Sequence, residues 1–132
     1  MRPAEEMAAL ARLAGLASDA AEARLAAHLR RAAELRNSLA ALEGERRERA
    51  TSLTEADPAL RAGADLRWHH WIDSRRALLN AELARSLAEA DRARAAVRQA
   101  FGKKMASEAV ARELLATQGL LAARRAERDQ LS

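Results

Sequence analysis

Apolar residues recur every three or four positions along most of the chain, with charged residues between them. In the first half this series comprises Met7, Leu10, Ala14, Ala17 and Ala21, then Leu25, His28, Ala32, Leu35, Leu39, Leu42 and Leu53. Such spacing is typical of an amphipathic helix that packs against a partner helix. The step from Ala21 to Leu25 indicates a stutter, which unwinds a supercoil locally without ending the helix. We therefore predict one helix over residues 4–53.

The helix-forming sequence is interrupted once, at residues 54–65, where an Asp57-Pro58 step and Gly63 lie close together. We predict that this segment is the tip of a hairpin. Asp57 and Pro58 suit the start of a single turn, and Gly63 suits its end. Asp65 then suits the cap of a second helix.

The second helix is predicted over residues 66–130, with a weak point at Gly119. Its inward-facing residues are predicted to be Trp68, Ile72, Leu79, Leu83, Leu87, Ala90, Val97, Phe101, Met105, Val110, Leu114, Leu115 and Leu121. If Leu53 faces Leu66 across the tip, residues that face each other on the two helices have numbers that add up to about 119. Both helices advance by ~1.5 Å per residue, so this pairing holds along their length. The first helix is then too short to cover the end of the second, which leaves a C-terminal helical overhang.

Composition supports an all-α fold, a long two-helix antiparallel coiled-coil hairpin that forms a single domain over residues 1–132. Aromatic residues are 2% of the chain, and the β-branched apolar residues are Ile72, Val97 and Val110, too few to fill a sheet surface. Alanine, leucine, glutamate and arginine are strong helix formers. In the predicted register Phe101 and Val97 face the small residues Ala17 and Ala21.

Nothing in the chain has the pattern of an active site or a cofactor site. There is no cysteine and no glycine-rich phosphate loop. His69 and Asp73 could offer two metal ligands from one helix face, but His70 points about 100° away, so we predict no metal site. We predict a non-enzymatic protein without a cofactor.

The expected location of the protein and the charge of its surface limit the kinds of partner that it could bind. The chain has no apolar run long enough to span a membrane, and Glu5 and Glu6 interrupt the apolar core that a signal peptide needs, so a cytoplasmic protein is expected. The 23 basic and 19 acidic residues give a mixed surface with net charge +4. Dedicated nucleic-acid arms carry denser charge of one sign, so nucleic acid is the least favoured partner.

Two stretches of the second helix are candidate contact surfaces. Trp68 and Trp71, with Ile72, make an apolar patch that either plugs the tip of the hairpin or stays partly exposed for a partner. A basic cluster further along either forms a solvated face, contacts an acidic protein or contacts phosphate. The cluster comprises Arg92, Arg94, Arg98, Lys103 and Lys104.

The layout resembles the FliJ/YscO family, the stalk proteins of flagellar and injectisome type III export. The resemblance covers roughly residues 4–118 and rests on length, on two long helices with a tip near mid-chain, and on a second helix that opens with Arg67-Trp68. It continues in Ile72, Leu78, Leu79 and Ala81 and in the segment 94–99, which carries two arginines and a glutamine.

The resemblance implies a cytosolic antiparallel coiled coil that enters the pore of a hexameric export ATPase and contacts the export gate protein. Export chaperones are further implied partners, and the protein would be peripheral at the inner membrane through the export apparatus. By the same resemblance, the gate contact falls on Trp68, Trp71, Ser74, Leu78 and Ala81.

Two other functions are compatible with the sequence. One is a generic coiled-coil scaffold or chaperone-like protein that forms a homodimer. The other is an RNA-binding helical arm, whose affinity would fall steeply with salt.

Overall fold

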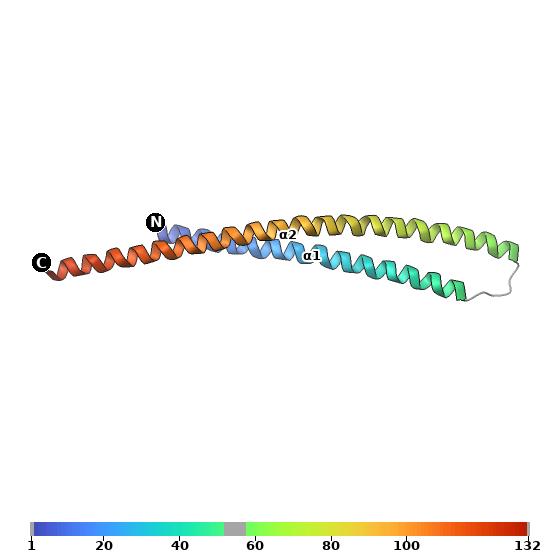
Figure 1. Cartoon of the computed structure of the whole chain (residues 1–132), viewed down its shortest axis with the longest axis horizontal. Helices are drawn as coiled ribbons and strands as arrows, with labels where there is room; N and C mark the ends of the chain where they lie inside the picture. The colour runs from blue at the N-terminus through green and yellow to red at the C-terminus, as the bar shows by residue number, and fades with distance from the viewer. Residues whose placement is uncertain (1, 52–57, 132) are drawn as a thin grey trace. The chain divides into compact units, whose positions relative to one another are not determined.

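The computed structural model describes residues 2–51 and 58–131, apart from the side chains of residues 59–61. These residues form two helices, α1 (Pro3–Thr51) and α2 (Pro58–Leu131), and the described part contains no strand (Figure 1). The helices pack against each other in opposite directions, which confirms the predicted all-α hairpin. Residues 52–57, which include part of the predicted tip and Leu53, lie outside the described residues.

The start of α2 differs from the prediction. The helix begins at Pro58 rather than at Leu66, and it passes through Gly63, which has no positive φ. Proline is favoured at the first helical position because its missing N–H would have no partner there. Asp65 lies inside the helix and does not cap it; its carboxylate pairs with Arg49 at 3.0 Å. A glycine inside a helix costs only about 1 kcal/mol, which the packing of a long helix can outweigh.

The replacement Gly63→Ala tests this helix start. We expect it to raise the free energy of unfolding by about 0.5–1 kcal/mol, because alanine has less backbone freedom to lose and a methyl group here meets no atom within 4 Å. Urea denaturation followed by circular dichroism measures the change. Gly102→Ala is the matched control, since Gly102 is also helical with open space around it. If Gly102→Ala stabilised the protein while Gly63→Ala destabilised it, Gly63 would have to adopt the left-handed turn conformation instead.

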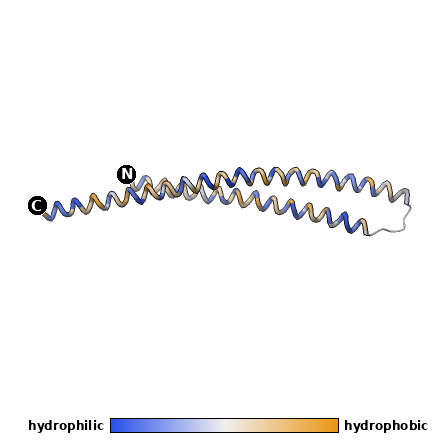
Figure 2. The backbone as a smooth tube through the Cα atoms, viewed as in Figure 1, coloured by the Kyte–Doolittle hydropathy of each residue, from blue (hydrophilic) through white to orange (hydrophobic). Residues whose placement is uncertain are grey.

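Gly119 does not interrupt α2 either, since the helix continues to Leu131. Residues 119–131 are all exposed, as expected for the predicted C-terminal overhang. Hydrophobic residues recur within this exposed stretch as they do along the paired parts of both helices (Figure 2).

The contacts divide the chain into two units. The unit Ala26–Asp91 contains the hydrophobic core, formed by Leu35, Leu42, Ile72 and Leu79, with Leu39, Trp68 and Leu83 packed against it. Ile72 has no solvent-exposed surface and Leu35 only 1%. Leucine and isoleucine from both helices therefore form the seam here, as the spacing predicted.

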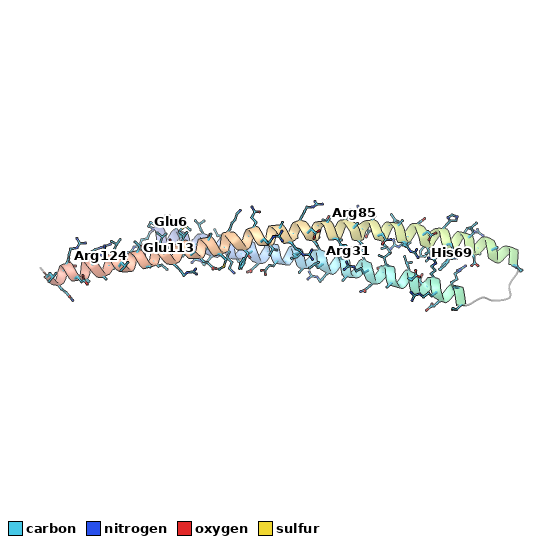
Figure 3. The ribbon with its side chains drawn as sticks, in the orientation of Figure 1. Glu6, Arg31, His69, Arg85, Glu113 and Arg124 are labelled. Atoms are coloured by element: carbon cyan, nitrogen blue, oxygen red, sulfur yellow. The ribbon has the colours of Figure 1, made fainter. Side chains whose placement is uncertain are left out.

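Ion pairs on the edges of this core agree with the predicted register. Arg76 donates to Glu43 at 3.1 Å, a pair whose numbers add up to the expected 119. Arg31 of α1, which is labelled in Figure 3, lies 2.9 Å from Glu82 of α2, and His28 lies 3.1 Å from Glu89, pairs whose numbers add up to 113 and 117. Each exposed pair contributes at most about 1 kcal/mol, so these pairs favour the register while the buried leucines supply the stability.

The other unit, Met1–Leu25 with Arg92–Ser132, has a seam of small residues. Ala4, Ser18, Ala21 and Ala111 are its buried residues. Several residues predicted to face inward are instead exposed, among them Phe101 at 48%, and this part of the prediction is wrong. The others are Leu10, Ala17, Met105, Val110 and Leu115.

The predicted stutter in this unit is also wrong. Beside the half-buried Ala8, Ala9 and Gly15, its buried and half-buried α1 residues include the series Ala4, Met7, Ala11, Ala14, Ser18, Ala21 and Leu25. Their spacing alternates between three and four residues throughout, as in an uninterrupted heptad. The predicted series shares Met7, Ala14 and Ala21 with this seam but includes the exposed Leu10 and Ala17 in place of Ala11 and Ser18. Small residues on the seam allow two backbones to approach closely, and the leucines beside it remain in solvent.

Candidate partner-binding face

The five residues predicted to contact a partner lie on α2 in the unit Ala26–Asp91, but they do not share one environment. Trp68 is half-buried on the seam. The other four, Trp71, Ser74, Leu78 and Ala81, are exposed. The tryptophans were expected either to plug the hairpin or to stay partly exposed for a partner. Trp68 does the first, because it is packed inside, and Trp71 matches the second, because it lies in solvent.

Trp68 is held in place by both helices. It packs against the core that contains Ile72, and the guanidinium carbon of Arg49 lies 4.6 Å from the centre of its ring. Arg49 is positioned in turn by Asp65, which accepts a hydrogen bond from Nε at 3.1 Å. His69 meets the Trp68 ring edge-on, with ring centres 5.3 Å apart. Trp68 is thus a structural residue that supports the helix surface beside it.

Trp71 and Leu78 form the exposed apolar part of this surface. They are 54% and 59% exposed, large fractions for such side chains. They belong to a series in which steps of four and three residues alternate, all of its members exposed: Arg67, Trp71, Ser74, Leu78, Ala81 and Arg85. We call these six residues the Trp71 face. Such spacing puts all six on one side of the helix, where a further helix could pack as in a coiled coil.

The two ends of the Trp71 face are positive. Neither Arg67 nor Arg85 has an ion-pair partner among the residues that the structure describes, and Arg85 stands on the outer surface of α2 (Figure 3). Sequence reasoning missed both arginines as members of the site. One more step of the heptad spacing, back from Trp71 to Arg67 and forward from Ala81 to Arg85, would have found them. The arrangement suits a partner with an apolar centre and acidic residues at both ends.

The predicted basic surface lies on α2 in the other unit and does not form a single face. Lys104 is half-buried, and the other four cations are exposed. At about 100° per residue, Arg92 and Lys103 point to one side, while Arg94 and Arg98 point to another. These cations are therefore spread around the helix, as in a solvated surface.

No group of side chains that could hold a metal ion is present within residues 2–51 and 58–131, because no three histidine, aspartate or glutamate side chains gather there. His69 meets Trp68, and His28 pairs with Glu89. Neither helix, in its described residues, has an apolar stretch that could cross a membrane.

Comparison of the chain with protein-family models, with characterised proteins and with solved structures finds no match. The remaining guides to function are the geometry of the exposed faces and the resemblance in layout to the FliJ/YscO family.

Proposed function

We propose that this protein is a non-enzymatic stalk or adaptor of a type III protein export apparatus, which enters a hexameric export ATPase and contacts the export gate protein. The observation that carries the proposal is the Trp71 face, an exposed heptad-spaced surface on a helical hairpin. It contains four of the five residues that the family resemblance assigns to the gate contact. Trp68, the fifth, acts beneath them by holding α2 in place.

The gate contact would combine apolar burial with charge pairing. Covering Trp71 and Leu78 removes from water two side chains worth about 1.5–3 kcal/mol each. Arg67 and Arg85 then meet acidic residues on the gate protein, which sets the orientation of the contact more than its strength. Because Ser74 and Ala81 are small, a partner helix can approach closely on either side of Leu78.

The contact with the ATPase would be electrostatic and mechanical. Exposed cations on several sides of α2, such as Arg92, Arg98 and Lys103, can meet polar or acidic loops around a ring. Cations distributed around a helix suit a rod that is surrounded by subunits better than they suit a flat contact. This distribution supports a stalk over a one-sided adaptor.

The proposal is tested with the export ATPase encoded in the same genome. We expect the two proteins to co-purify and the hydrolysis rate of the ATPase to change when the chain is added. The variant Trp71→Ala should behave like the natural chain in this assay, because Trp71 belongs to the gate contact. If the chain neither co-purified with the ATPase nor altered its activity at low salt, the export role would be refuted.

A further inference from the structure

A second exposed heptad series lies on α1 in the unit Met1–Leu25. It comprises Glu6, Leu10, Leu13, Ala17, Ala20 and Arg24, all of them exposed. Leu10 and Leu13 are 51% and 61% exposed although alanine and serine occupy the seam beside them. We call these six residues the Leu13 face. Apolar side chains concentrated on one exposed side of a helix indicate an interaction surface.

Opposite charges stand at the two ends of the Leu13 face. Glu6 and Arg24 are separated by about five full helical turns, so their side chains leave α1 on the same side. Glu6 lies on the outside of the first part of α1 (Figure 3). Neither side chain has an ion-pair partner in the described part of the chain.

We propose that the Leu13 face binds the same face of a second copy of this chain, with the two α1 helices antiparallel. A two-fold axis beside residue 15 places Glu6 opposite Arg24 of the second copy, and Arg24 opposite its Glu6. The same operation places Leu10 opposite Ala20 and Leu13 opposite Ala17. In such a symmetric interface each contact occurs twice.

The order of residues along the face identifies the second copy as the occupant. From Glu6 to Arg24 the series runs from a negative charge through two leucines to two alanines and a positive charge. Antiparallel pairing therefore puts large residues against small ones and joins opposite charges at both ends. Parallel pairing would put Glu6 against Glu6 and leucine against leucine. The face is thus complementary to itself in one orientation.

The contact is small, which sets its expected strength. Five helical turns span about 27 Å, and one helix face of that length is less than a standard protein interface. We expect a dimer with Kd of about 10–100 μM, corresponding to a weak interface. The inference goes beyond the proposed export role and uses no residue of the Trp71 face.

Sedimentation equilibrium of the full chain, from about 5 to 500 μM, tests the inference. The natural chain should dimerise. Glu6→Arg and Arg24→Glu should each weaken the dimer about tenfold, because one substitution turns two attractions into two repulsions. The double variant Glu6→Arg with Arg24→Glu should restore the affinity to within about threefold, since both pairs are re-formed with exchanged charges.

Glu5→Arg is the matched control, because Glu5 is also exposed in the first turn of α1 but points about 100° away from Glu6. It should leave dimerisation unchanged. Circular dichroism shows whether each variant keeps its helix. Leu13→Ala, which preserves helix propensity, provides a charge-independent variant and should also weaken the dimer about tenfold. A chain that stays monomeric up to 500 μM overturns the inference, as does a dimer that Leu13→Ala and the charge variants leave unchanged.

Discussion

Replacing Ile72 by alanine is expected to lower the free energy of unfolding by about 3 kcal/mol. Ile72 has no exposed surface and packs with Leu35, Leu42 and Leu79 in the core of the unit Ala26–Asp91. Removing three carbon atoms from this site loses their transfer free energy and leaves space that two rigid helices fill only in part. Because the core of a two-helix hairpin is narrow, few other contacts compensate.

Urea denaturation followed by circular dichroism measures this loss, and Leu78→Ala is the control. Leu78 belongs to the same helix but is 59% exposed, and leucine and alanine have similar helix propensities. We expect the control to change the free energy of unfolding by less than about 0.5 kcal/mol. Equal effects of the two substitutions would mean that the apolar seam does not pass through Ile72.

Replacing Trp71 by alanine is expected to weaken binding to the cytosolic part of the export gate protein by about 30-fold or more. This corresponds to at least about 2 kcal/mol, as is usual for a tryptophan at the centre of an interface. Trp71 is 54% exposed in the free chain, so its removal should affect stability little. Leu78→Ala should also weaken binding, by a smaller factor. Titration calorimetry with the purified gate fragment measures both affinities.

Leu66→Ala is the control for gate binding. Leu66 is 61% exposed on the same helix but is not part of the Trp71 face, so its replacement should leave the affinity unchanged. If Trp71→Ala bound as tightly as the natural chain, the Trp71 face would not be the gate contact. If the natural chain itself failed to bind the gate protein while it still bound the ATPase, the gate contact would be refuted and the ATPase contact would stand.

The register of the hairpin could be predicted because most of the large aliphatic residues described in the unit Ala26–Asp91 lie on its seam. Leu35, Leu42 and Leu79 are buried there, while Leu29, Leu66 and Leu78 are exposed. Hydrophobic periodicity therefore marks the correct face there. The pair of Glu43 with Arg76 agrees with the register expected from the chain on either side of the tip.

The same reasoning failed in the unit that contains the ends of the chain, because size and burial are not correlated there. Leu10 and Leu13 are exposed while Ser18 and Ala21 are buried. Phe101 is likewise outside. The predicted series placed Leu10 and Ala17 on the seam in place of Ala11 and Ser18, and the phase that results needs a stutter to connect it to Leu25. The Leu13 face was consequently missed as a site.

Sequence alone is enough to predict that the chain is helical, that it folds back on itself, and which segments of its two helices meet. These properties depend on composition, on three-and-four spacing and on the length of chain on either side of the tip, all of which are local. Packing in three dimensions decided which heptad series is covered, that Gly63 and Asp65 lie inside α2, and that Trp68 rather than Trp71 is held by Arg49. A helix carries several candidate faces at once, and which of them is buried depends on the surface of the other helix.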